Sequence, residues 1–543
     1  MVAFRPRYRN NGIIYNLQRL LQKRIHISRY SIPFYIILIL NIPIIAFIIF
    51  LIVKAIIDHH NNDFYLTRSR EKYQSKVDQP FYEGCVEPQI NAPRANATLV
   101  VLARNNEIED VLKSMKSLER HFNQWYQYPW TFLNDEVFDE EFKRRVIQFT
   151  SAPVHFGTIS SDIWDFPEDL DPITRKENIQ LQGDRGIMYG AMESYHKMCR
   201  FYSGGFYKHD LVRKYEWYWR VEPNIEFFCD IPYDPFIEMG KQGKKYGFTV
   251  IIKELFETVP NLFRYTKAFL KENNIKPRSA WNLFVDSYKR DLIIKDESFY
   301  SKYFKFVSDE SSIKSRFGEI FRVEHLISKF SNKDYKLNQH DEKAIEDIVL
   351  NSIDRARLPT LQGESMDGES YNLLHFWSNF EIARVDLWDN NLYESYFKFL
   401  EDNGGFFKER WGDAPIHSIA VAFLLNIEEI HYFRDIGYKH STIGHCPANS
   451  PHQLPFPEKT KTYKIKDSVF DNHYDKFDKP HSYGSGCRCR CPDKHKEIED
   501  HKDDFYGNWF DMINDVQYFK LDFDEYGKEL KKAFDHNKEA LNL

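Results

Sequence analysis

Residues 215–236 read YEWYWRVEPNIEFFCDIPYDPF, a pattern that predicts a buried strand with a polar end. Aromatic and branched residues run into Glu222-Pro223-Asn224, after which the alternation resumes and ends at Cys229. A carboxylate at a strand end, followed by a proline that fixes the backbone, is well placed to hold a hard cation. The alternative is a solvated Glu222 in a surface turn, and the local pattern alone favours that alternative.

Strand and helix patterns alternate on both sides of this stretch. The predicted strands are 98–103, 130–134, 154–159, 216–228 and 246–252, and the predicted helices are 107–122 and 190–202. Such alternation predicts an α/β fold with a mixed, mainly parallel sheet flanked by helices. In such sheets the ligand binds beyond the carboxyl ends of the strands.

A segment of different composition separates two halves of the α/β pattern. Residues 255–357 are rich in Lys and Phe and helical in pattern, which predicts a helical insertion. The α/β pattern then resumes at residue 372. We therefore predict one large domain over 81–496, followed by a charged C-terminal extension over 497–543.

Composition limits the class of protein. The 543-residue chain is 42% hydrophobic and 16% aromatic, which favours a large packed core and argues against a mostly disordered chain. A net charge of -6 argues against nucleic acid as a partner. The sequence has no Gly-rich phosphate loop, nucleophile elbow or zinc-protease motif.

The N-terminal region predicts a membrane anchor. Residues 32–53 are almost wholly apolar and long enough to span a bilayer as a helix. The segment 1–31 carries seven Lys and Arg residues and no acid, so the positive-inside rule places it in the cytosol and the rest of the chain across the membrane. A cleaved signal peptide is the alternative, but the apolar run is too long and starts too late. The prediction is a type II protein with a polar stem at 54–80.

Seven cysteines are expected to meet an oxidising lumen, where disulfides form. The odd number leaves at least one thiol unpaired or paired between chains. The run CRCRC at 487–491 is open to a metal-site interpretation, together with His481 and His495. Alternate cysteines lack the two-residue spacing of zinc knuckles, however, so disulfides are favoured.

Three further residues suit chemistry by their type and surroundings. Glu381 lies in an apolar, aromatic run, where a carboxylate is costly unless it is paired or used. It is therefore either a structural ion pair or a group that stabilises or attacks an oxocarbenium-like centre. Asp413 precedes Ala-Pro and an apolar helix, which is typical of an ordinary N-cap. His440 suits manganese or zinc, but a lone histidine is a weak signal.

Together these segments resemble the fungal α-1,2-mannosyltransferase family, glycosyltransferase family 15. The resemblance covers about 92–257 and 368–491. It rests on a series of long motifs in order: ATLVVLARN, WTFLNDEVF, ESYHKMCRFYSGGFY, YWRVEPNIEFFCDIPYDPF, YGFT, YNLLHFWSNFEIA, GGFFKERWGDAPIHS and FRDIGYKH. The type II architecture predicted above is also what this family shows.

The resemblance implies an A-type nucleotide-sugar glycosyltransferase fold in a Golgi enzyme that uses GDP-mannose and one Mn²⁺ ion. Such an enzyme transfers mannose with retention to the 2-hydroxyl of mannose, on N- or O-linked glycans of cell-wall mannoproteins. By match to the family motifs, Glu222 and His440 look like the Mn²⁺ ligands, with the EPN segment at 222–224 replacing the usual Asp-x-Asp. Arg104, Glu222 and Asn224 are the implied contacts to the nucleotide side.

On the sugar side, Glu381 looks like the family's candidate nucleophile and Asp413 like a supporting acid near the acceptor. Tyr195 looks like the active-site tyrosine that reaches toward donor and acceptor. The chain departs from the family pattern at His196-Lys197, where Arg-His is expected, and in its longer insertion. Both departures are expected to alter the acceptor pocket.

Two alternatives stay open beside mannosyl transfer. Some relatives are thought to transfer mannosylphosphate, with the same donor and metal. A lectin-like scaffold subunit without activity is the alternative of a different class, and the joint presence of Glu222, Glu381, Asp413 and His440 argues against it. The expected partners are GDP-mannose, mannose-terminated glycans on glycoproteins, the membrane through one helix, and complexes with other Golgi transferases.

Overall fold

The computed structural model describes residues 23–27, 30–33, 47–54, 75, 77–167, 171–287, 365–366, 369–455, 477–492 and 496–514. Residues 1–67 and 68–543 form two units, each of which is described by itself.

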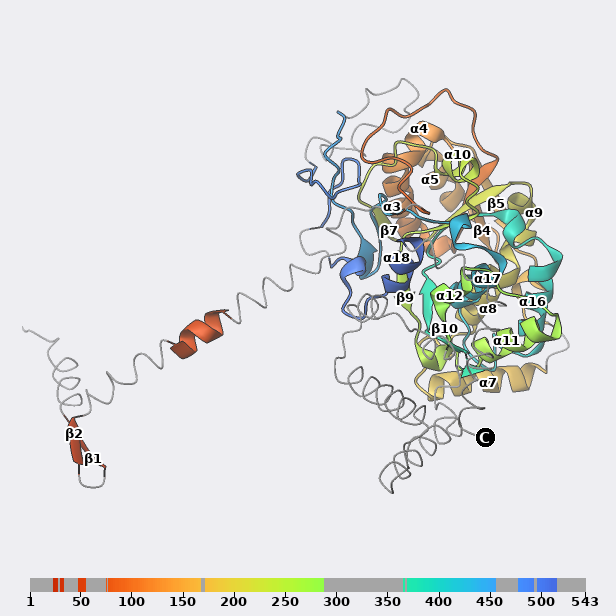
Figure 1. Cartoon of the computed structure of the whole chain (residues 1–543). Helices are drawn as coiled ribbons and strands as arrows, with labels where there is room; N and C mark the ends of the chain where they lie inside the picture. Colours follow the sequence, from red (N-terminus) through yellow and green to blue (C-terminus); the bar gives the residue numbers. More distant parts are fainter. Residues whose placement is uncertain are drawn as a thin grey trace, which may run out of the picture. The chain divides into compact units, whose positions relative to one another are not determined.

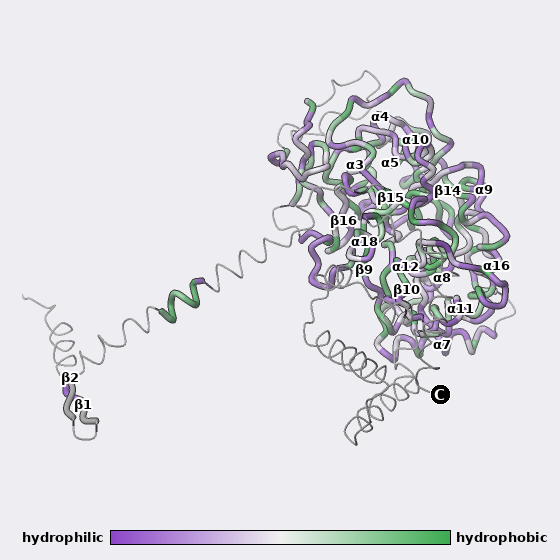
Figure 2. The backbone as a smooth tube through the Cα atoms, in the orientation of Figure 1, coloured by the Kyte–Doolittle hydropathy of each residue, from purple (hydrophilic) through white to green (hydrophobic). Residues whose placement is uncertain are grey.

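In the N-terminal unit, β1 (Arg24–Ile27) pairs antiparallel with β2 (Tyr30–Pro33). Residues 47–54 form a short helix that is apolar up to Lys54, as Figure 2 shows. Residues 34–46 of the predicted membrane helix lie outside the described residues. Within the described part of the chain, no helix has both the length and the apolar character that crossing a membrane requires.

The large unit is built on a seven-stranded sheet with the strand order β15-β8-β14-β6-β3-β4-β5. Neighbouring strands run parallel except at β14, which is antiparallel to both β6 and β8. The strands are β3 (Ala97–Leu102), β4 (Trp130–Asn134), β5 (Val154–Thr158), β6 (Trp217–Val221), β8 (Tyr246–Phe248), β14 (Phe380–Arg384) and β15 (Ile430–Tyr432). The prediction of a mixed, mainly parallel sheet is confirmed.

Two groups of helices flank this sheet (Figure 1). One group contains α3 (Ile108–Leu118), α4 (Gln124–Tyr126), α5 (Glu140–Phe149) and α10 (Pro235–Lys241). The other contains α8 (Glu193–Gly204), α11 (Leu262–Glu272), α16 (Asn391–Asp402) and α17 (Asp413–Leu424). Other described elements are α6 (Ser161–Trp164), α7 (Pro172–Asp184), α9 (Asp210–Arg213), α12 (Trp281–Phe284), α18 (Gly507–Asn514), β9 (Ile251–Lys253), β10 (Val285–Ser287), β11 (Ser365–Met366), β12 (Glu369–Tyr371) and β13 (Leu374–Phe376).

The central strand β6 explains why helices cover both faces. Side chains alternate along a strand, so Trp219 and Tyr218 point to opposite faces. Trp219 packs against Phe122 and Phe236, on the side of α3 and α10. Tyr218 packs against Phe206, which directly follows α8. All five residues of β6 are buried, as expected of a strand that is covered on both faces.

A separate three-stranded sheet holds the chain that follows β6. In it β7 (Ile225–Phe227) pairs with β16 (Tyr438–His440), which pairs with β17 (Ile443–His445), all antiparallel. The single strand that the sequence predicted here is therefore divided into β6 and β7. The division falls at Pro223 and Asn224, because Asn224 has a φ of 61°, in the left-handed region that a continuous strand cannot use.

Segments predicted to lie outside the main domain contribute to its core. Asp78, from the predicted stem, is buried, accepts a hydrogen bond from the backbone N–H of Tyr432 at 2.9 Å and pairs with Lys244 at 3.1 Å. Tyr506 and Trp509, from the predicted C-terminal extension, are fully buried in the same hydrophobic core as the sheet. Residues 515–543 lie outside the described residues.

The predicted insertion is only partly covered, since residues 288–357 lie outside the described residues. Its described part includes α11, whose Phe263 and Phe269 are buried in the main core. Tyr396 of α16 packs against Phe269, with the ring centroids 5.3 Å apart. This first part of the segment is therefore integral to the α/β body.

Candidate active site

A pocket of about 220 Å³ opens at the carboxyl ends of β3, β4 and β6, where the sheet topology predicts a ligand. Residues that follow these strands form one part of its wall, and residues of α8 and its neighbours form the other. The lining residues are Leu102, Ala103, Arg104, Glu107, Asn134, Asp135, Trp164, Met192, Ser194, Tyr195, Met198, Tyr202, Glu222 and Pro223. A wall of apolar side chains with a few converging charged groups is typical of a small-molecule site.

Glu222 directly follows β6 and forms part of the pocket wall. Its Oε1 accepts a hydrogen bond from Arg220 Nε at 2.6 Å. Arg220 is buried, and its guanidinium lies 3.4 Å over the ring of Tyr202, while its Nη1 donates to Asp413 Oδ2. One buried arginine therefore holds two carboxylates and balances their charge, which a buried carboxylate requires.

Asp413 is the first residue of α17, but its side chain does not cap that helix. The N-cap is Gly412, and Asp413 Oδ2 accepts hydrogen bonds from Arg220 and from Ser378 Oγ, the latter at 2.8 Å. Burial raises the pKa of Asp413, but the charge of Arg220 and these hydrogen bonds outweigh burial and hold the pKa below its usual value. The N-cap alternative is therefore wrong, and Asp413 is an ionised partner of Arg220.

His440 ends β16 and lies opposite Ile225, which follows Glu222 by three residues. Its Nδ1 lies 2.5 Å from the side-chain amide of Asn379. Burial lowers the pKa of His440, and the negative charge of Glu222 opposes this shift. The fold therefore brings the two predicted metal ligands, from segments more than two hundred residues apart, within electrostatic reach of each other.

These two side chains fit a divalent cation that is shared with a bound ligand. A carboxylate oxygen and an imidazole nitrogen are both acceptable to Mn²⁺. Over the described ranges, no group of three or more His, Cys, Asp or Glu side chains is arranged to hold a metal ion. Metal ions at sites that bind substrate phosphates commonly take part of their ligands from the substrate and from water.

The two other predicted nucleotide contacts lie in different surroundings. Arg104 is exposed and lines the pocket, and its backbone N–H donates to Glu107 Oε2 at 2.7 Å. Asn224 is directed toward α3, where its Oδ1 accepts a hydrogen bond from Lys113 Nζ at 2.8 Å, and it is not among the lining residues. Arg104 is thus placed to meet an anionic ligand, and contact between Asn224 and a nucleotide stays a prediction.

Tyr195 lines the pocket from α8. Its hydroxyl lies 3.4 Å from Arg410 Nη1, and its ring stacks on Tyr189 with a centroid distance of 4.6 Å. Burial raises the pKa of Tyr195, so the hydroxyl keeps its proton and can donate a hydrogen bond. Tyr189 is exposed and has a φ of 58°, in the left-handed region that is uncommon for non-glycine residues.

Glu381 lies in the interior of the sheet. It is on β14, is 1% exposed and does not line the pocket. Its carboxylate accepts hydrogen bonds from the hydroxyls of Tyr218 and Tyr246, and its Oε2 lies 3.0 Å from His417 Nδ1. Burial raises its pKa, but His417 and the hydrogen bonds hold the pKa below the usual value. Attack on a sugar carbon therefore requires a conformation other than the one described.

Several residues of the site were missed by sequence reasoning. Arg220 holds Glu222 and Asp413, and Ser378 and Asn379 hold Asp413 and His440. For Arg220 a signal existed, because a charged residue between the aromatic and branched residues of a buried strand needs a buried partner. Ser378 and Asn379 carry no such signal, since polar residues are ordinary in a turn between strands.

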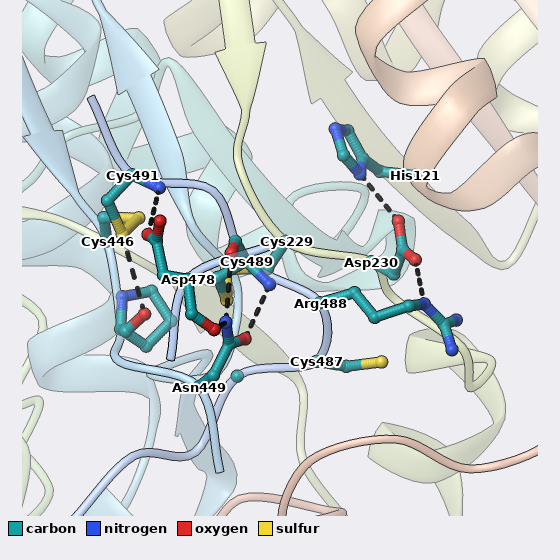
Figure 3. The surroundings of a disulfide bond; sticks show 12 residues. His121, Cys229, Asp230, Cys446, Asn449, Asp478, Cys487, Arg488, Cys489 and Cys491 are labelled. Atoms are coloured by element: carbon teal, nitrogen blue, oxygen red, sulfur yellow. Dashed lines mark hydrogen bonds and ion pairs between the residues drawn. A yellow bond between two sulfur atoms is a disulfide. The ribbon is translucent and has the colours of Figure 1, made fainter. Parts of the chain in front are cut away.

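Three disulfides fasten the sheet that carries His440. The run at 487–491 is joined to three distant segments through Cys85–Cys487, Cys229–Cys489 and Cys446–Cys491. Cys229 lies two residues after β7, and Cys446 directly follows β17. Figure 3 shows these cysteines together with Arg488, whose Nε donates to Asp230. The disulfide prediction for this run is confirmed, and Cys199 is the free cysteine, which is buried.

Loss of the bond between Cys229 and Cys489 is expected to lower the free energy of unfolding by about 2–5 kcal/mol, because it closes a long loop in the unfolded chain. The variant carries Cys229→Ser and Cys489→Ser together, so that no new free thiol is left. Urea unfolding measures the change. Cys199→Ala, which leaves all three disulfides intact, is the matched control. An unfolding midpoint of the double variant equal to that of the wild type would contradict the expectation.

Comparison with known families decides what kind of site this is. The chain matches the model of the glycolipid 2-alpha-mannosyltransferase family over residues 58–291 and 303–459. The chain belongs to this family. This match confirms the family that the motifs predicted, and Glu222, Glu381, Asp413 and His440 of this mannosyltransferase fall within the matched ranges.

Individual relatives of the mannosyltransferase cover most of the chain. The probable mannosyltransferase KTR7 of Saccharomyces cerevisiae is 46% identical over 476 residues, which is 86% of either chain. O-glycoside alpha-1,2-mannosyltransferase homolog 4 of Schizosaccharomyces pombe is 39% identical over 447 residues, covering 82% of this chain and 84% of the relative. Among solved structures, core-mannan synthase A from Aspergillus fumigatus in its Mn/GDP form is 31% identical, with a TM-score of 0.49 over 71% of this chain and 89% of that chain.

Proposed function

We propose that this mannosyltransferase transfers mannose from GDP-mannose, with retention and with Mn²⁺, to the 2-hydroxyl of mannose on N- or O-linked glycans of cell-wall mannoproteins. The observation that carries the proposal is Glu222 in the wall of a pocket at the strand ends, three residues before Ile225, which pairs with His440 across β7 and β16. The names of relatives that are α-1,2-mannosyltransferases support the linkage, and the O-glycoside transferase of Schizosaccharomyces pombe supports an O-linked acceptor.

On the donor side, Glu222 and His440 would hold the metal ion, with Glu222 supplying carboxylate oxygen and His440 an imidazole nitrogen. A bound divalent ion neutralises the charge that develops on a departing diphosphate. Arg104 lies on the same wall and adds positive charge for the same group. Arg220 keeps Glu222 in place beforehand, so that its carboxylate need not reorganise when the donor binds.

On the sugar side, we assign Tyr195 the role of a hydrogen-bond donor. Its protonated hydroxyl would bind either GDP-mannose or the acceptor glycan. Asp413 does not line the pocket. It supports the site by holding Arg220 and Ser378 through hydrogen bonds. The contacts of Glu381 support a framework role in the sheet, in competition with the predicted nucleophilic role.

We extend the proposal to an A-type nucleotide-sugar transferase fold in a type II protein of the Golgi membrane, working with other Golgi transferases. The apolar run at 32–53 and the basic segment before it support the anchor and its orientation. Three disulfides in the large unit support a lumenal position, because such bonds persist in oxidising compartments.

The test is a transfer assay on the full chain in detergent, with GDP-mannose and methyl α-mannoside. We expect a product with an α-1,2 linkage in the presence of Mn²⁺ and none after chelation, with activity restored by adding Mn²⁺ back. NMR of the product gives the linkage and the anomeric configuration. A product joined through phosphodiester would favour mannosylphosphate transfer, and binding of glycan without any transfer would favour a lectin-like scaffold.

A further inference from the structure

The turn that joins β13 to β14 contacts two residues of the site, His440 and Asp413, through three consecutive residues. The Trp377 ring lies 5.4 Å from the His440 ring, centroid to centroid. Ser378 Oγ donates to Asp413 at 2.8 Å, and the amide of Asn379 lies 2.5 Å from His440 Nδ1. The turn therefore connects the metal-ligand candidate with the buried Arg220–Asp413 pair, and Asn379 makes its polar contact to the imidazole.

The backbone of Asn379 is itself fixed by the strand that carries His440. The hydroxyl of Tyr438 donates to the carbonyl oxygen of Asn379 at 3.0 Å. Tyr438 is fully buried in β16, two residues before His440. The strand that carries His440 therefore also holds the backbone from which the Asn379 side chain reaches the imidazole.

The orientation of this amide decides which ring nitrogen of His440 is available. The contact joins the end of the Asn379 amide to Nδ1. If Nδ1 accepts a hydrogen bond, a neutral imidazole carries its proton on Nε2 and cannot offer that nitrogen to a cation. If Nδ1 donates to Oδ1 of the amide, the proton is on Nδ1 and Nε2 is a free lone pair.

We propose that Asn379 is a positioning residue for His440: its Oδ1 accepts a hydrogen bond from Nδ1–H, which leaves Nε2 free for the ion. This rests on the proposed function, in which His440 is a metal ligand. Metal-binding histidines generally donate their second N–H to an acceptor that fixes the tautomer and the ring, and Asn379 supplies that acceptor here.

The test compares Asn379→Leu, which has a similar size and no acceptor, with Asn379→Asp, which offers only acceptors. The full chain in detergent is titrated with Mn²⁺ in the presence of GDP, and free Mn²⁺ is measured by electron paramagnetic resonance. We expect Asn379→Leu to raise the Kd for Mn²⁺ by about 10- to 100-fold. Asn379→Asp is expected to bind Mn²⁺ at least as tightly as the wild type.

Two further measurements separate positioning from a structural role. In the transfer assay, Asn379→Leu should need more Mn²⁺ for half-maximal activity and keep its rate at saturating Mn²⁺. Should the leucine variant fail to fold, Asn379→Ala removes the same acceptor with a smaller side chain. Binding of GDP without metal should be unchanged in each variant.

The outcomes distinguish this inference from the proposed function. If His440→Ala binds Mn²⁺ as tightly as the wild type, the metal-site assignment itself fails. If His440→Ala loses Mn²⁺ while the leucine and alanine variants of Asn379 retain it, only the role of Asn379 is overturned. Weaker Mn²⁺ binding by Asn379→Asp than by Asn379→Leu also overturns it, because an acceptor would then be harmful.

Discussion

Replacement of Glu222 by glutamine is expected to lower kcat/KM for mannose transfer at least about 100-fold, which is the usual effect of removing one preorganised group that stabilises transition-state charge. Glutamine keeps the size of the side chain and can still accept the hydrogen bond from Arg220 Nε. It removes the negative charge, which is what a cation beside a diphosphate needs from its protein ligand. The fold should therefore persist while the metal-dependent reaction is lost.

The measurement is initial rate against Mn²⁺ concentration, with thermal unfolding of the same preparation. Glu226→Gln is the matched control, because Glu226 lies on β7, four residues further on, and pairs with Lys113 at 3.0 Å on the surface. Activity of Glu226→Gln should equal that of the wild type. Full Mn²⁺-dependent activity in Glu222→Gln would show that Glu222 is not a metal ligand. The pocket would then bind its ligand in another way.

The sheet could be predicted from the sequence because its signal is local. Strands predicted at 98–103 and 130–134 correspond to β3 and β4, since each is a short apolar run whose residues are nearly all buried. The position of the pocket follows from the parallel order of these strands. The break between β6 and β7 was missed because a proline at a strand end and an asparagine that adopts a positive φ do not interrupt the alternation on either side.

The partners within the site could not be predicted, because they come from distant parts of the chain. Asp413 has the local pattern of an N-cap, yet its carboxylate meets an arginine 193 residues away. Cys85 and Cys487 are separated by 402 residues, and cysteine spacing does not define which cysteines pair. The burial of Asp78 and Trp509 was missed for the same reason. Both lie in segments whose polar and charged composition predicts exposure, and their contacts come from distant parts of the chain.

Glu381 shows how a correct local observation leaves two roles open. A carboxylate in an apolar strand must be paired or used, and the sequence does not say which. The structure supplies three donors, from β6, β8 and α17, and these account for its burial. These contacts account for a buried carboxylate at this position without a catalytic role. An experiment can distinguish the two roles.

Replacement of Glu381 by glutamine is expected to lower the free energy of unfolding at neutral pH by about 3 kcal/mol, the scale of hydrogen bonds to a buried charge. The folded-state pKa of Glu381 lies below its usual value, so the ionised form contributes stability that is present above the unfolded-state pKa and is lost as pH falls through the folded-state pKa. The difference in the free energy of unfolding between wild type and variant should therefore disappear at low pH. Urea unfolding from neutral pH downward measures it, with Tyr246→Phe, which removes one donor, as a control that should cost about 1 kcal/mol.

The same variant separates the two roles of Glu381. If the residue is framework, Glu381→Gln loses stability, and activity falls only as far as the pocket is disturbed. If the residue attacks the sugar, Glu381→Gln loses nearly all of kcat even where the variant is fully folded, and wild-type enzyme held with donor alone carries a mannosyl ester on Glu381 that mass spectrometry detects. The second pattern would contradict the framework role and would require β14 or its neighbours to open, because a carboxylate that is 1% exposed cannot reach a substrate in the pocket.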